Sequence, residues 1–167
     1  MIASLSIGYA AYPVMNPAHV SNVEAVFSPG GSEEVLMALV GGAEKSVDVM
    51  MYVFSYSPLK AALIDAANRG VVVRVILDRQ IETNLLTAQD LALSGVDVRW
   101  ASVEYASTHA KLLIADAKTV FVGSQNWSRH AMVLNREAGA LIRDVKTALD
   151  YAAVFESDWR KAKPWKP

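Results

Sequence analysis

Two dense apolar runs separated by an amphipathic segment constrain the fold of this chain more than any other feature. Residues 46–54 and 71–77 have the length and composition of buried strands. Between them, Pro58 suits the first turn of a helix, and Gly70 is typical of a residue that ends one. A strand, a helix and a strand at this spacing form a βαβ unit with parallel strands and a right-handed crossover. The unit predicts an α/β fold.

Weaker patterns predict the elements on either side of this unit. Further strands are expected over residues 23–28, 96–100 and 137–142, further helices over 32–41, 83–93 and 147–161, and an irregular or short helical connection over 127–135. The apolar face of the last helix is expected to consist of Leu149, Ala153, Val154 and Trp159. Together these elements predict a mixed β-sheet sandwiched by helices, with one domain over residues 23–163 and a tail over 164–167.

The composition describes a compact globular chain and excludes several kinds of chemistry. Hydrophobic residues make up 53% of the 167 residues, and 16 Lys and Arg against 17 Asp and Glu leave a formal net charge of −1. The overall charge therefore argues neither for nor against a nucleic-acid partner, which only a local basic patch would recognise. Because the chain has no Cys, disulfides, thiolate nucleophiles and Cys-ligated zinc are excluded. An exported and a cytoplasmic location both stay open.

The first 22 residues are set apart from the predicted domain. Residues 1–14 are apolar and rich in small side chains, contain no Lys or Arg, and are too few to span a bilayer. Residues 1–22 are interpreted either as the remnant of a leader or anchor, or as an N-terminal arm that packs on the domain or on a partner subunit.

The stretch 109–126 carries the residues that point to chemistry. It contains two short apolar runs joined by a three-residue link, which predicts a hairpin. In an antiparallel hairpin the start of the first strand lies beside the end of the second. His109 and Lys111 are two residues apart and point to one face, and Ser124 and Asn126 do the same on the other strand. An imidazole, an ammonium, a hydroxyl and an amide would thus converge at one end of a sheet, where they can hold and attack a phosphate.

The spacing of these residues resembles the HKD motif of the phospholipase D superfamily. The motif positions are His109, Lys111, Asp116, Gly123, Ser124 and Asn126. The resemblance extends over residues 23–161 and is strongest to the small single-motif members, the bacterial endonuclease Nuc and the Zucchini-type nucleases. It implies the same α/β sandwich, and it implies that neither a metal nor another cofactor is needed.

The resemblance also implies a role for each motif residue. His109 would attack phosphorus and form a phosphohistidine, while Lys111, Ser124 and Asn126 would bind phosphate oxygens. Glu137 matches the carboxylate that orients the nucleophile in the family. The chemistry agrees, because an imidazole is available in its neutral form near neutral pH and a carboxylate on its other nitrogen stabilises the developing positive charge.

The other two motif positions are expected to be structural. Asp116 lies at the far end of its strand from the histidine, so its expected role is to bond backbone or a basic neighbour and shape the hairpin. Gly123 ends the second apolar run of the hairpin, and the residues that follow it are of types common in turns.

A second group must protonate the leaving oxygen, and the chain contains one copy of the motif. Double-motif relatives use the histidine of their second copy, whereas His19 and His130 lie in no second motif here. The simplest solution is a two-fold homodimer that brings two copies of His109 together, one as nucleophile and one as general acid.

Residues beside the motif are candidates for substrate contacts. Trp127, Arg129 and His130 would stack a base and bind a neighbouring phosphate, unless the tryptophan is simply packed in the protein. Tyr105 and Ser107, on the preceding loop, are similar candidates. The basic C-terminal residues 160–167 are more often a solvated end than a binding patch.

Three functions remain open at this point. The first is a metal-independent phosphodiesterase that cleaves nucleic acid, an endonuclease on DNA or RNA. The second is a phospholipase D-type hydrolase of membrane lipids, for which the apolar N-terminal segment would be the membrane contact; it is less favoured, because one domain of this size leaves little room for acyl chains. The third is a non-catalytic nucleic-acid-binding or protein-binding relative, which the intact motif argues against.

Overall fold

The computed structural model describes residues 22–166, and its elements follow the predicted order. The arm predicted over residues 1–22 lies outside this range except for Asn22. The elements are β1 (Val23–Ser28), α1 (Ser32–Gly41), β2 (Ser46–Met51), α2 (Ser57–Asn68), β3 (Val72–Leu77), α3 (Thr83–Leu93), β4 (Asp97–Trp100), β5 (Lys111–Ala115), β6 (Thr119–Gly123), α4 (Arg129–Val133), β7 (Glu137–Ile142), α5 (Val145–Lys161) and β8 (Lys163–Pro164). None of the helices in this range is long and apolar enough to cross a membrane.

The strands of the described chain form one sheet in the order β1-β7-β6-β5-β2-β3-β4-β8. β2 is parallel to β3 and β3 to β4, which confirms the parallel strands of the predicted βαβ unit. The remaining neighbours are antiparallel, so the sheet is mixed, as expected. The predicted hairpin, β5 and β6, lies in the middle of the sheet beside β2.

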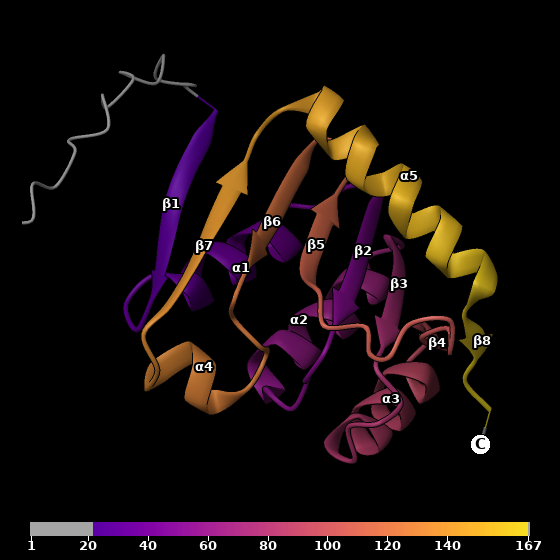
Figure 1. Ribbon diagram of the computed structural model, residues 1–167. Helices are drawn as coiled ribbons and strands as arrows, with labels where there is room; N and C mark the ends of the chain where they lie inside the picture. The colour runs from indigo at the N-terminus through magenta and orange to yellow at the C-terminus, as the bar shows by residue number, and fades with distance from the viewer. Residues whose placement is uncertain (1–21, 167) are drawn as a thin grey trace, which may run out of the picture.

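Helices cover both faces of the sheet, so the predicted sandwich is confirmed (Figure 1). α1, α2 and α3 lie on one face, and α5 crosses the other. Because side chains alternate along a strand, β2 contributes to both cores. Val49 packs in the core with the first three helices, whereas its neighbour Met50 packs in the core with α5.

The face that α5 turns toward the sheet differs from the predicted one. Leu149, Ala153 and Val154 were expected to be buried, but all three are exposed. The helix instead packs on the sheet through Ala148, Phe155 and Trp159. Of the four residues predicted from the apolar pattern, only Trp159 faces the sheet. A polar network between α5 and the sheet explains why the helix is rotated away from the predicted face.

Arg74 of β3 fixes the rotation of α5. Its guanidinium donates to both carboxylate oxygens of Asp48 in β2, at 2.7 and 2.9 Å, and to Glu156 of α5 at 2.8 Å. The same group lies 5.0 Å from the centre of the Phe155 ring and 5.2 Å from the Trp159 ring. Cation–π contacts and charged hydrogen bonds thus select the aromatic face of the helix over the aliphatic one.

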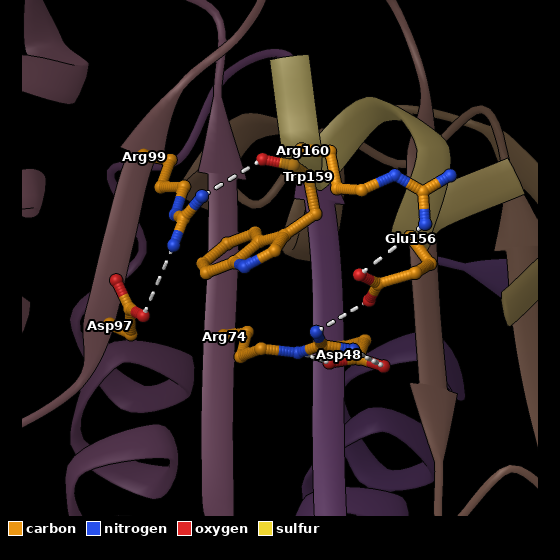
Figure 2. A network of polar contacts seen from close by, with 7 residues as sticks. All are labelled: Asp48, Arg74, Asp97, Arg99, Glu156, Trp159 and Arg160. Atoms are coloured by element: carbon orange, nitrogen blue, oxygen red, sulfur yellow. Dashed lines mark hydrogen bonds and ion pairs between the residues drawn. The ribbon is translucent and has the colours of Figure 1, made fainter. Parts of the chain in front are cut away.

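A second arginine completes this network. Figure 2 shows the Trp159 ring between two guanidinium groups, with Arg99 of β4 at 4.2 Å from its centre. Arg99 also donates to the Trp159 carbonyl at 3.0 Å and lies 3.9 Å from Asp97. The end of α5 is therefore attached to β4 as well as to β2 and β3.

The segment after α5 belongs to the sheet. Residues 164–167 were expected to be a separate tail, but Pro164 lies in β8, which pairs antiparallel with β4. The Trp165 amide donates to the Val98 carbonyl at 2.9 Å. A two-residue strand carries no periodic signal, which is why the sequence pattern missed it.

Gly123 has a packing role that its neighbours explain. It faces Gly139 across β6 and β7, and the buried side chain of Gln125 fills the space beside both glycines. A Cβ on Gly123 would lie 2.1 Å from the Gln125 side-chain oxygen and 2.7 Å from the Gly139 Cα. Because one of these contacts is backbone, both strands would have to move.

Gly123→Ala is therefore expected to lower the free energy of unfolding by about 2 kcal/mol, measured by urea denaturation. Gly41→Ala is the matched control, because a Cβ there meets nothing within 4 Å. The control is expected to be neutral or to stabilise by up to about 1 kcal/mol. Equal stability of the two variants would contradict the packing argument.

Candidate active site

The hairpin brings the start of β5 beside the end of β6. Leu112 pairs with Val122 and Ala115 with Thr119, which is the predicted antiparallel register. Asp116 and Ala117 both have positive φ angles, 54° and 51°, as in the tight turns that match the twist of a hairpin. The polar residues that flank the two strands therefore gather at the opposite end from this turn.

His109 and Lys111 lie together at that end. The Lys111 Nζ lies 2.8 Å from the His109 Nδ1 and donates to the His109 carbonyl at 2.7 Å. The Nζ also lies 3.3 Å from the His109 Nε2, so the ammonium is close to both ring nitrogens. His109 is exposed while Lys111 is buried, 4% exposed. The histidine is thus open to a substrate, and the lysine lies behind it.

Burial changes the acidity of this lysine. Desolvation lowers the pKa of Lys111 below its ordinary value, and the nearby carboxylate of Glu137 opposes the effect without cancelling it. The positive charge at the site is therefore lost at a lower pH than that of a solvated lysine.

Ser124 and Glu137 form the second half of the site. The Ser124 hydroxyl donates to Glu137 and accepts a hydrogen bond from the Ala138 amide at 3.2 Å. The other Glu137 oxygen accepts from the Asn135 side chain at 3.2 Å. Glu137 was expected to orient His109, but within residues 22–166 its hydrogen bonds go to the serine and the asparagine. The structure places it close enough to Lys111 to act on its charge.

Asn126 is half-buried at the same end of the sheet. Its side-chain oxygen is buried and accepts no hydrogen bond from any residue between 22 and 166.

Trp127 does not contact the site as a stacking surface, so that prediction is wrong. Its side chain is 1% exposed and makes an edge-on contact with Phe54, with ring centres 4.8 Å apart. Its backbone bonds Val53, Ser55 and Tyr56, which ties the chain after β6 to the chain after β2. The alternative of a packed tryptophan is correct.

The neighbours of this tryptophan remain candidates for substrate contact. Arg129 and His130 are exposed in α4, whose N-terminal cap is Ser128. Tyr105 and Ser107 are also exposed, in the loop between β4 and β5. All four are free to meet a ligand, unlike Trp127.

Asp116 lies at the other end of the hairpin. Its carboxylate accepts from the backbone amides of Glu44, Lys45 and Ser46, at 2.7 to 3.2 Å. Burial by itself would raise the pKa of Asp116, but these three bonds outweigh it and hold the pKa below its usual value. The residue joins the turn to the chain before β2 and has no contact with the polar end of the sheet.

The sequence pattern missed Tyr52, whose ring packs on the histidine. The ring centres of Tyr52 and His109 are 4.2 Å apart, and the Lys111 Nζ lies 4.9 Å from the tyrosine centre. Tyr52 follows β2 directly, and its amide donates to the Ala110 carbonyl at 3.0 Å. Nothing local in the sequence links it to His109, because the pairing of β2 with β5 joins distant segments.

Two buried polar residues hold the loop before the histidine, and these were also missed. Asp78 accepts the amides of Gln80 at 2.8 Å and Thr108 at 2.7 Å. The Asn84 side chain donates to the Asp78 and Tyr52 carbonyls, both at 2.8 Å. Two features of the sequence could have identified them. Asp78 directly follows an apolar strand, and Asn84 lies on the buried face of a helix.

The described residues contain no group of three or more His, Asp and Glu side chains arranged to hold a metal ion. The polar end of the hairpin and β7 carry one imidazole, one ammonium, one hydroxyl, one amide and one carboxylate. This set can bind the oxygens of a phosphate and present a nucleophile to its phosphorus.

Comparisons with known proteins agree with this chemistry. A family model described as "Cardiolipin synthase, PLD-like domain" matches residues 36–159. Phospholipase D of Rickettsia prowazekii is 33% identical over 150 residues, which cover 89% of this chain and 73% of that protein. Mitochondrial cardiolipin hydrolase of Mus musculus is 30% identical over 142 residues, covering 83% of this chain and 62% of that protein.

The fold has a close match among solved structures. The crystal structure of Nuc from Salmonella typhimurium, a phospholipase D family member, superposes with a TM-score of 0.82 at 25% identity and covers 87% of this chain and 98% of its own. The fold and the site together define a hydrolase of phosphodiesters. The chain belongs to the phospholipase D superfamily, which confirms the resemblance seen in the motif.

Proposed function

We propose that this protein is a metal-independent phosphodiesterase that cleaves nucleic acid through a phosphohistidine at His109. The observation that carries the proposal is the exposed imidazole with the Lys111 ammonium 2.8 Å from its Nδ1. A neutral ring nitrogen is the nucleophile, and the ammonium moves from the ring to a phosphate oxygen when substrate binds.

The reaction proceeds in two displacements at phosphorus. First, a nitrogen of His109 forms a bond to phosphorus while the bond to the leaving oxygen breaks, and that oxygen takes up a proton. Water then attacks phosphorus, loses a proton, and the nitrogen–phosphorus bond breaks. Lys111, Ser124 and Asn126 stabilise the charge on the phosphate oxygens in both steps, and Glu137 supports the positive charge that forms on the imidazole.

A second copy of the chain supplies the general acid in this proposal. His130 lies on α4 outside the polar cluster, and His19 lies outside the described residues. In a two-fold dimer, the His109 of the second copy would lie at the leaving oxygen and donate the proton that this oxygen needs. Specific activity is then expected to fall on dilution in parallel with the dimer fraction measured by sedimentation. Full activity of a strict monomer would contradict this part of the mechanism.

Nucleic acid is favoured over lipid as the substrate because the site is polar and open. His109 and Ser124 are exposed, and the hollow at the loop before His109 has Asp78, Arg79 and Gln80 in its lining as well as the apolar Val103 and Ala106. The relative Nuc also supports this choice. The names of the Rickettsia and mouse relatives favour the lipid alternative, so a direct comparison of substrates is needed.

The deciding experiment is cleavage of single-stranded DNA, double-stranded DNA, RNA and cardiolipin vesicles, each with and without EDTA. Nucleic acid is expected to be cleaved equally well with EDTA, and the vesicles to stay intact. Cleavage of the lipid alone would replace the proposed substrate, and a loss of activity in EDTA would overturn the metal-independent mechanism.

The pKa of Lys111 predicts a pH effect on this activity. Because the pKa is lowered, kcat/KM is expected to decline on the alkaline side below about pH 10.4, where an ordinary lysine titrates. Glu137→Gln removes the charge that raises the Lys111 pKa, so the decline should move to lower pH. Glu44→Gln, an exposed carboxylate before β2, is the control and should leave the position of the decline unchanged. A decline that stays in place in Glu137→Gln would contradict the coupling.

A further inference from the structure

Three adjoining hollows run from the loop before His109 toward the C-terminal residues. The first, of about 250 Å³, is lined by residues of the β4–β5 loop and by Asp78, Arg79 and Gln80. The second, of about 200 Å³, shares Arg79 and Ala101 with the first. The third, of about 320 Å³, shares Leu85 with the second. Because neighbouring hollows share lining residues, they are described together as the lateral groove. The elements that line it are β4, α3 and β8, whose places in the fold can be followed in Figure 1.

The lateral groove carries unneutralised positive charge. Arg79 lines the first two hollows, Lys163 the second and Lys166 the third. All three are exposed, and among residues 22–166 none of them forms an ion pair. Lys161 nearby differs, because it is paired with Glu104 at 2.8 Å. Other exposed cations without an ion pair, such as Lys45, Lys118 and Arg129, lie elsewhere on the described surface, but each of the three hollows has one in its lining.

Each hollow also has an aromatic residue in its lining. Tyr105 lines the first hollow, Trp100 the second and Trp165 the third. Tyr105 is 52% exposed, and the two tryptophans are partly exposed. Both tryptophans are held by the pairing of β4 with β8, so their positions are set by the sheet. A positive groove with stacked aromatic positions is the arrangement that binds single-stranded nucleic acid.

We propose that the lateral groove binds the single-stranded nucleic acid chain beyond the phosphate that is cleaved. This inference rests on the proposed function. It adds that the substrate is single-stranded and that its chain runs from the active site along the lateral groove. Phosphates contact Arg79, Lys163 and Lys166, and bases stack on Trp100 and Trp165.

The cations in the hollows favour a nucleic acid over a lipid. The first hollow mixes polar side chains, such as Asp78, Gln80 and Ser107, with the apolar Ala101, Val103 and Ala106. A repeating polyanion meets a cation in each of the three hollows, whereas an acyl chain has no charge to match them. Charge complementarity therefore selects the strand.

The test measures binding of a fluorescently labelled oligothymidylate to the full chain carrying His109→Asn, which prevents cleavage. In this background Lys163→Ala/Lys166→Ala is expected to weaken binding about tenfold and to reduce the slope of log affinity against log salt by about 1.4, because two phosphate contacts are lost. Lys45→Ala/Lys118→Ala is the matched control. Its lysines are equally exposed but lie by the start of β2 and in the β5–β6 turn, at the opposite end of the sheet.

The affinity of Lys45→Ala/Lys118→Ala for the oligothymidylate is expected to fall less than twofold. An equal loss in both pairs would overturn the proposal, because it would mean that only overall charge matters. An unchanged affinity in Lys163→Ala/Lys166→Ala would also overturn it, and a loss of binding to cardiolipin vesicles instead would assign the groove to lipid. Hydrolysis of bis(p-nitrophenyl) phosphate by the unmodified protein tests the proposed function separately, because this small diester does not reach the groove.

Discussion

His109→Ala is expected to reduce phosphodiester hydrolysis by about 10⁴-fold or more, the range seen when a covalent nucleophile is removed. The imidazole is the exposed nucleophile of the site, and the neighbouring Lys111 and Ser124 can bind phosphate oxygens but cannot replace it. The residual rate would come from this binding alone. Initial rates with bis(p-nitrophenyl) phosphate in EDTA are the direct measurement.

The mechanism also predicts a trapped intermediate. Rapid acid-free denaturation of the wild type during turnover of a ³²P-labelled substrate should leave an acid-labile, base-stable label on the protein, and His109→Ala should carry none. His130→Ala is the matched control, because this exposed histidine lies outside the cluster; its activity is expected to fall less than tenfold. Circular dichroism checks that the variants fold. Full activity of His109→Ala would contradict the phosphohistidine mechanism.

Arg74→Met is expected to destabilise the protein by about 3 kcal/mol. Asp48 is 6% exposed and relies on both bonds from the guanidinium, so the substitution leaves a buried carboxylate without its cation. The arginine side chain is itself 25% exposed, so some water reaches the pair and the loss lies at the lower end for broken buried pairs. Loss of the contacts with Phe155 and Trp159 adds to it.

The matching double variant separates the charge from the packing. Asp48→Leu/Arg74→Met removes both charges and is expected to lie within about 1 kcal/mol of the wild type, because apolar replacements of buried pairs are often neutral. Glu156 is half exposed and keeps water as a partner. Urea denaturation of the wild type, both single variants and the double variant gives the coupling energy. Additive losses would show that the pair contributes no more than its separate parts.

The sequence predicted those parts of the fold that depend on neighbouring residues. The strand and helix bounds are right to within a few residues, because periodicity, capping residues and glycines act locally. The hairpin was also predicted, since its two strands are joined by a short turn. Its register then follows from the turn, so the start of β5 lies beside the end of β6, as predicted.

The errors arise where distant segments meet. The face of α5 was wrong because Arg74, more than seventy residues away, draws the aromatic side of the helix onto the sheet. Trp127 was misread because its partner, Phe54, follows β2. Tyr52 was missed for the same reason, since only the pairing of β2 with β5 brings it to His109. The polarity of a residue in the sequence does not show which distant residue its side chain will contact in the fold.

The pairing of β1 with β7 has a consequence for how the chain acquires its structure. β1 begins the described chain, but its neighbour in the sheet is β7, with Val23 opposite Ile142. During synthesis, β1 emerges more than a hundred residues before its partner, and closing so long a loop is slow. The rest of the sheet can assemble from closer partners first. β1 is therefore expected to join the sheet late in folding, and its buried residue Val26 reaches its final packing only after β7 has been made.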